Sequence, residues 1–162
     1  MEFPQPEVGL VISYSYLWSD EAEAGHVEGR KSRPCAIVLV VQNAQGKAPV
    51  VTVVPITHSP HRSPDAAIEI PPAVKRHLGL DDQPSWIVLD DFNVFTWPGY
   101  DLRPVPAQKD RYHYGLLPPR LFESIVDKFS EVRRQGQAAR TSRDDGAMQK
   151  QALRHRVTSW QR

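Results

Sequence analysis

The sequence predicts a mainly β protein: a small, strongly bent antiparallel barrel with one C-terminal helix. Fifteen prolines in 162 residues separate short apolar runs, which is typical of short strands and turns rather than long helices. Two aliphatic runs, Pro34–Val41 and Val50–Pro55, are joined by a short connection that contains Gly46, which predicts a hairpin. Only Pro119–Arg134 has the apolar spacing of a long helix.

The remaining elements before that helix are short. Val8–Tyr16 alternates in part and is rich in aromatic residues, so it is predicted to be the first strand. Trp18–Arg30 is polar and contains two glycines, which predicts a long loop between strands. Pro71 and Pro72 are expected to open a helical turn that ends near Gly79. Three further short strands are expected where apolar runs lie between turn residues: Ala66–Ile70, Ser85–Leu89 and Phe92–Trp97.

The C-terminal helix is expected to divide the chain into two parts. Its stripe recurs every three or four residues and consists of Leu121, Phe122, Ile125, Val126, Phe129 and Val132. We therefore predict a barrel domain over residues 1–134 and a polar basic tail over residues 135–162. The tail is expected to be partly disordered, or a marginal helix over Met148–Trp160.

Composition excludes several classes of protein. The longest aliphatic run, Cys35–Val41, is far shorter than the about 20 residues of a membrane span. The N-terminus lacks the basic and apolar regions of a signal peptide, so a cytoplasmic location is expected. With a single cysteine, an intrachain disulfide and a multi-cysteine zinc site are both excluded. From Glu131 onward there are eight Lys and Arg but three Asp and Glu, so a basic tail follows a mildly acidic body and could contact nucleic acid or an acidic partner.

Two polar residues are expected to meet at one edge of the predicted hairpin. Arg33 directly precedes the first strand, and Thr57 closes the second. Antiparallel pairing places the start of one strand beside the end of the next. His58 follows Thr57 directly, and Glu28 lies five residues before Arg33. The hairpin therefore predicts a cluster of a cation, a hydroxyl and two titratable groups.

The order and spacing of several segments resemble the MazF/PemK/Kid toxins, the ribonuclease components of type II toxin–antitoxin systems. The resemblance extends from about Glu7 to Asp127. It rests on a glycine opening the first strand in "VGLVISY", a Glu shortly before "RP", the aliphatic strand that follows, "VPIT" and "DDFNVFTW". "WPGYDLRPV" and "YHYGLLP" are similar to the PemK-like branch.

The resemblance implies an SH3-like or CcdB-like barrel that forms a homodimer and is neutralised by an antitoxin protein. It also implies cleavage of single-stranded RNA without a metal or another cofactor. The family's catalytic Arg and Thr fall on Arg33 and Thr57, and the spacing of Glu28 matches as well. This chain departs from the family pattern at His58, where a small polar residue is usual, and in its longer, more acidic 18–30 loop.

The residue types suit metal-free RNA cleavage. Such cleavage needs a base for the 2′-hydroxyl proton and a cation for the charge on the phosphoryl oxygens. Arg33 offers a planar fork of donors, and Thr57 offers one further donor. His58 is the candidate base, with Glu28 as the alternative. In the structural alternatives, Arg33 pairs with Glu28 or with Asp90 or Asp91, Thr57 is a turn hydroxyl, and His58 caps the strand end.

Three other residues are candidates for RNA contacts. Asn93 is a candidate to recognise a base edge, and Trp18 and Trp97 are candidates to stack on unpaired bases. The alternative for these rings is a place in the core or in a dimer contact, and Trp97 with Pro98 and Gly99 is typical of a packed corner. His58 and His61 have no third ligand nearby in the sequence, so no metal site is predicted.

Two other functions remain open from the sequence. One is a non-catalytic poison that, like CcdB, binds DNA gyrase. The other is a family member that acts only as a binding module. The Arg33 and Thr57 pair favours the nuclease, whereas the acidic body favours the binding module.

Overall fold

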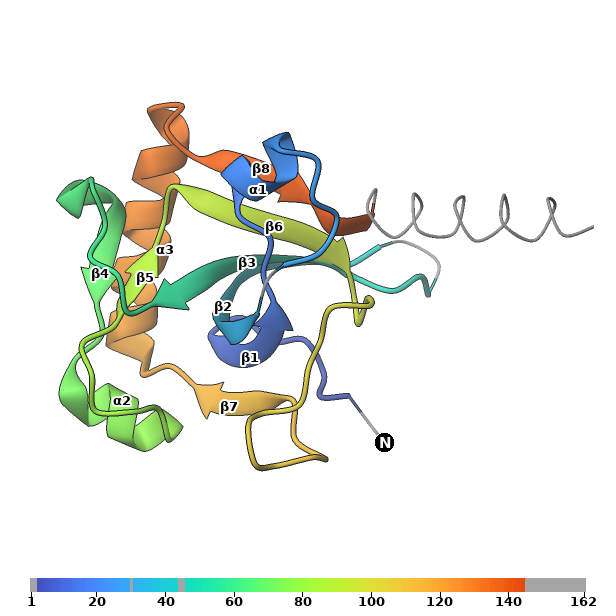
Figure 1. Cartoon of the computed structure of the whole chain (residues 1–162), viewed down its shortest axis with the longest axis horizontal. Coiled ribbons are helices and arrows are strands. Elements are labelled where there is room, and N and C mark those ends of the chain that lie inside the picture. The colour runs from blue at the N-terminus through green and yellow to red at the C-terminus, as the bar shows by residue number, and fades with distance from the viewer. Residues whose placement is uncertain (1–2, 30, 44–45, 145–162) are drawn as a thin grey trace, which may run out of the picture.

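The computed structural model describes residues 3–29, 31–43 and 46–144. These residues form eight strands, three α-helices and one 3-10 helix, η1 (Figure 1). In chain order they are β1 (Leu10–Ser15), α1 (Ser19–Glu23), β2 (Ser32–Val41), β3 (Val50–Thr57), η1 (Pro64–Ala66), β4 (Ala67–Glu69), α2 (Pro72–Leu78), β5 (Trp86–Val88), β6 (Asp91–Thr96), β7 (His113–Leu116), α3 (Pro119–Arg134) and β8 (Ala139–Ser142). The prediction of a mainly β fold with a C-terminal helix is therefore confirmed.

The strands form one bent sheet that does not close into a ring. Its main path runs β4-β5-β3-β2-β1-β7, and β6 pairs with both β3 and β8. All pairs are antiparallel except β6 with β8. β3 pairs with β6 through Val50–Val53 and with β5 through Ile56 and Thr57, so it joins the two halves of the sheet. A closed barrel is not observed because the end strands β4 and β7 do not pair, and α2 contacts β7 instead.

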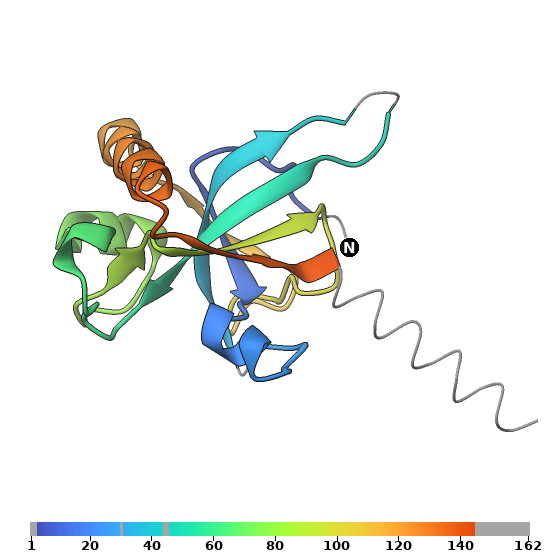
Figure 2. The same cartoon turned by 90° about the horizontal axis from the view of Figure 1, so that it is seen from above.

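The predicted hairpin and helices agree closely with the structure. β2 and β3 form the hairpin, which extends away from the body of the molecule in Figure 2. α3 covers the predicted residues, and Gly79 ends α2 at φ 70°, a left-handed conformation that favours glycine.

Three elements differ from the sequence prediction. α1 lies within the expected 18–30 loop, and β7 and β8 were not expected. β8 lies in the predicted tail, so the sheet continues past the expected boundary at residue 134. The expected helix over Met148–Trp160 falls outside the described residues.

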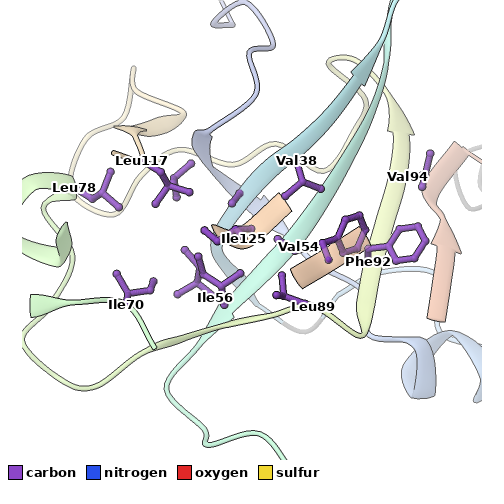
Figure 3. Packing of buried hydrophobic residues seen from close by; sticks show 14 residues of the cluster. Val38, Val54, Ile56, Ile70, Leu78, Leu89, Phe92, Val94, Leu117 and Ile125 are labelled. Carbon is purple, nitrogen blue, oxygen red and sulfur yellow. The ribbon is translucent and has the colours of Figure 1, made fainter. Parts of the chain in front are cut away.

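Two buried clusters lie on the two sides of the sheet. In the first, Ile125 of α3 lies close to Val54 and Ile56 of β3 (Figure 3), and Phe129 of α3 belongs to the same cluster. In the second, the rings of Tyr14, Phe95 and Trp97 stack with centroids 4.8 and 6.1 Å apart. Burial of such rings is a large stabilising contribution, and it fixes the central strands that hold the site described below.

No helix in the described part of the chain has the length and apolar character of a membrane span.

Candidate active site

The register of the hairpin brings Arg33 and Thr57 to the same end of the sheet. Cys35 pairs with Pro55, and Ala36 pairs with Val54. Arg33 precedes Cys35 by two residues, and Thr57 follows Pro55 by two residues, so they continue the same antiparallel register. Both side chains are half-buried. The expected meeting of the two residues at one edge is therefore observed.

A cavity of about 460 Å³ opens at this edge of the sheet. Arg33, Thr57 and His58 line it together. Lys31 and Tyr114 are also among its lining residues. A cation, a hydroxyl and an imidazole therefore face one space.

Both ring nitrogens of His58 have protein partners. Its Nδ1 lies 3.1 Å from the carbonyl oxygen of Pro84 and 3.1 Å from Oγ of Ser85. Its Nε2 lies 2.8 Å from Oδ2 of Asp81. The Thr57 hydroxyl oxygen accepts a hydrogen bond of 3.2 Å from the backbone amide of Ser59. The loop after β3 is thus fixed in place, and the His58 ring is held by its neighbours.

The partner of His58 is itself anchored by a buried lysine. Lys75 is 4% exposed, and its Nζ donates to Oδ1 of Asp81 at 2.9 Å and to the carbonyl of Gln83. The hydrogen bond from Lys75 lowers the pKa of the Asp81 carboxyl, with smaller contributions from the Gln83 amide and His58.

Replacing Asp81 by asparagine is expected to destabilise the fold by about 1 kcal/mol at pH 7. The variant removes the carboxylate from the buried Lys75 ammonium, but the half-exposed site is screened by solvent. Because the pKa of Asp81 is lowered on folding, its contribution is present above the unfolded pKa and is lost as the pH falls through the folded pKa. Denaturation at pH 7 and at pH 3 should therefore show the larger difference between wild type and D81N at pH 7.

Lys75→Met is the matched comparison, because it removes the buried charge while keeping an unbranched apolar stem. Its effect on stability should be near neutral. Equal destabilisation by both substitutions would contradict this account of the Lys75 and Asp81 pair.

Arg33 also borders a second, larger cavity. Its guanidinium carbon lies 5.1 Å from the centroid of the Trp18 ring, a cation–π contact. Both residues line a cavity of about 770 Å³, as do His61 and Asp90. Among the described residues the Arg33 Nε atom has no hydrogen-bond partner. Arg33 therefore stands between two cavities and is oriented by an aromatic ring.

The other predicted site residues have different environments. Glu28 is exposed and is not among the residues that line either cavity. Asn93 is fully buried; its Oδ1 accepts from the amide of Leu17 at 3.1 Å, and its Nδ2 donates to the carbonyl of Leu17 at 2.7 Å. The described contacts of Asn93 are structural and do not support a role in recognising bases, because the side chain is fully buried and its amide binds the Leu17 backbone.

Trp97 has a structural environment as well. It is 8% exposed and belongs to the second core cluster, so it presents no ring face for RNA to stack on. The alternative interpretation of a packed corner is the correct one. Trp18 is half-buried beside Arg33 and remains a candidate to stack on unpaired RNA bases.

Two residues of the larger cavity were not selected from the sequence as a functional pair. His61 Nε2 lies 2.6 Å from Oδ2 of Asp90. The two are 29 positions apart, and no local pattern indicates that they meet. The described residues contain no group of three His, Cys, Asp or Glu side chains placed to hold a metal ion.

The fold and the site define the class of protein. A bent, mainly antiparallel sheet carries an arginine and a threonine at the ends of paired neighbouring strands, beside a cavity. Residues 17–96 match the family described as the PemK-like, MazF-like toxin of type II toxin–antitoxin system, so this part of the chain is similar to that family.

The matched segment is shorter than the resemblance over Glu7–Asp127 that the sequence suggests. It runs from Leu17, the residue before Trp18, to Thr96 at the end of β6, so it includes Arg33, Thr57 and His58. Comparison with curated proteins and with solved structures yields no match.

Proposed function

We propose that this PemK-like toxin is an endoribonuclease that cleaves single-stranded RNA at a short sequence without a metal. The proposal rests on one observation. A single cavity at the ends of β2 and β3 is lined by Arg33, Thr57 and His58. The family match supports the toxin class. The Arg33 guanidinium and the Thr57 hydroxyl beside this cavity support the cleavage of a phosphodiester bond.

In the proposed reaction, the 2′-hydroxyl of one nucleotide attacks the adjacent phosphorus. Negative charge builds up on the phosphoryl oxygens as the bond to the 5′-oxygen breaks. The Arg33 fork donates to these oxygens, and its charge cannot be lost by deprotonation. The Thr57 hydroxyl donates one further hydrogen bond. The products are a 2′,3′-cyclic phosphate and a 5′-hydroxyl.

Trp18 is proposed to contribute to RNA binding. Its half-buried ring lies against Arg33 at the border of the larger cavity. An unpaired base next to the scissile phosphate could stack on it, a contact worth about 1–3 kcal/mol.

Two residues predicted from the sequence, His58 and Glu28, are candidates for the base that accepts the 2′-hydroxyl proton. His58 lines the same cavity as Arg33, whereas Glu28 lines neither cavity. The position of His58 therefore favours it over Glu28, although both of its ring nitrogens are engaged with protein groups.

The experiment is to incubate the purified chain with a long single-stranded RNA in EDTA and to map the cut ends. Cleavage at a short recurrent sequence, with cyclic phosphate ends, is expected. Intact RNA in the presence of folded protein would overturn the nuclease and favour a non-catalytic binding module or a poison of the gyrase-binding type.

Thr57→Val is expected to slow cleavage by roughly 10–100-fold, because it removes one hydrogen bond to a charged transition state but keeps the shape of the side chain. The rate is measured under single-turnover conditions. Ser124→Ala is the matched control, because it removes a hydroxyl from the exposed face of α3. Equal rates for T57V and wild type would exclude Thr57 from the site.

The partners of the chain follow from its class. A type II toxin has a cognate antitoxin, and we propose that an antitoxin protein binds this chain and blocks RNA cleavage. A homodimer and a cytoplasmic location are also proposed from the similarity to this class of toxin. Light scattering of the purified protein, alone and with the antitoxin, measures the homodimer and the toxin–antitoxin complex.

A further inference from the structure

The larger cavity contains a histidine and a carboxylate in direct contact. Nε2 of His61 lies 2.6 Å from Oδ2 of Asp90, and the side chains are 22% and 23% exposed. A carboxylate accepts a hydrogen bond, so Nε2 carries the proton in this contact. In the neutral ring the other nitrogen, Nδ1, is then the acceptor. The contact with Asp90 therefore prepares His61 to take up a proton at Nδ1.

Backbone hydrogen bonds hold the bend that carries Asp90. His61 lies between β3 and η1, and Asp90 lies in the bend between β5 and β6. The amide of Leu89 donates to the carbonyl of Ala66 at 2.8 Å, which ties the bend to the segment after His61. The amide of Ala139 donates to the carbonyl of Asp90 at 2.8 Å. The position of Asp90 is thus fixed on both sides of the bend, and Nε2 of His61 is held by the Asp90 carboxylate.

Arg33 connects this pair to the proposed reaction. It lines the larger cavity with His61 and Asp90, and it lines the smaller cavity with Thr57. A phosphate held by the Arg33 guanidinium therefore has Thr57 on the side of one cavity and His61 on the side of the other.

His61 is better suited than His58 to accept a proton from a substrate. The His58 ring is bound through Nδ1 to Pro84 and Ser85 and through Nε2 to Asp81. For His61, the contact within the described part of the chain is the one that Nε2 makes with Asp90. The His58 imidazole is thus engaged at both nitrogens, whereas the His61 imidazole is oriented through Nε2.

We propose that His61, oriented by Asp90, is the general base of RNA cleavage; this inference rests on the proposed ribonuclease function. The 2′-hydroxyl proton moves to Nδ1 of His61 as the bond from the 2′-oxygen to phosphorus forms. The bond from phosphorus to the 5′-oxygen breaks, and that oxygen takes a proton from water. The Asp90 carboxylate stabilises the imidazolium, which then releases its proton to water.

Charged groups of both signs face His61 across the cavity. The cations are Lys31, Arg33 and Arg62, and the carboxyl groups are Asp20, Glu21, Asp90 and Asp91. Burial raises the pKa of Asp91, which is bound to Ser19 and Tyr16. The cations suit a phosphate ligand. The carboxylate in contact with the ring is that of Asp90.

The test compares pH–rate profiles of wild type, His61→Ala and Asp90→Asn on one short RNA in EDTA. The wild-type rate should rise with pH to a plateau. H61A should be about 10²–10⁴-fold slower and should lack this rise. D90N should be slower by at least about tenfold, because an amide that donates to Nε2 would favour the wrong tautomer. His77→Ala, on the exposed face of α2, is the matched control.

The RNA affinity of H61A distinguishes a general base, which affects the cleavage rate, from a residue that only maintains the structure of the site. Fluorescence anisotropy with an RNA that carries a 2′-deoxy nucleotide at the cut site should give H61A an affinity within about threefold of wild type. A wild-type rate and pH rise in H61A would overturn the inference while leaving the ribonuclease intact. A loss of RNA affinity equal to the loss of rate would overturn it too. Failure of the wild-type chain to cut RNA would instead overturn the proposed function, and the inference with it.

Discussion

Arg33→Ala is expected to lower the single-turnover rate of RNA cleavage by about 10²–10³-fold. The substitution removes the bidentate donor from the phosphoryl oxygens on which charge develops. Arg33→Lys should recover part of the rate, because an ammonium restores the charge but not the planar fork. The assay is cleavage of one defined RNA in EDTA with enzyme in excess.

The fold should survive the Arg33 substitution. The contact that is lost is the half-buried cation–π pair with Trp18, worth about 0.5–1 kcal/mol. Arg76→Ala is the matched control, since Arg76 is exposed on α2 and lines neither cavity. A folded R33A protein that cleaves at the wild-type rate would remove Arg33 from the reaction.

Arg143→Ala is expected to destabilise the fold by about 3–5 kcal/mol. Arg143 follows β8, and its Nη2 lies 2.7 Å from Oδ1 of Asp101, with side chains 2% and 8% exposed. Removing the arginine leaves the Asp101 carboxylate buried without its partner. The free energy of unfolding in urea measures the effect.

A surface pair provides the comparison for this prediction. Arg134 contacts Glu131 on α3, but these side chains are 75% and 50% exposed. R134A should therefore change the free energy of unfolding by less than about 0.5 kcal/mol. If R143A and R134A are equally stable, the end of β8 is not held by the buried ion pair.

The elements that were predicted correctly have local signals. The hairpin of β2 and β3 follows from aliphatic runs around a turn, and α3 follows from its apolar spacing and its initial prolines. β8 has the sequence ARTS, without an apolar alternation, and it pairs in parallel with β6 far away in the chain. Its strand conformation depends on that tertiary partner, which a local pattern does not encode.

The same distinction applies to the site. Arg33 and Thr57 were brought together by the register of one hairpin, which sequence spacing predicts. Asn93 and Trp97 were selected for their residue types, but burial determines what they contact. The contact of His61 with Asp90 depends on how the β5–β6 bend packs against the segment after β3. No spacing rule in the sequence predicts that long-range contact.

The most direct test of the account is to replace the ribose on the 5′ side of the mapped cut by 2′-deoxyribose. We expect cleavage at that position to stop, because the attacking hydroxyl is removed. The affinity measured by fluorescence anisotropy should stay the same, because the phosphate that Arg33 binds is kept. Continued cleavage of the deoxy-substituted RNA at the same bond would contradict the account, since the attacking group would then be water rather than the 2′-hydroxyl.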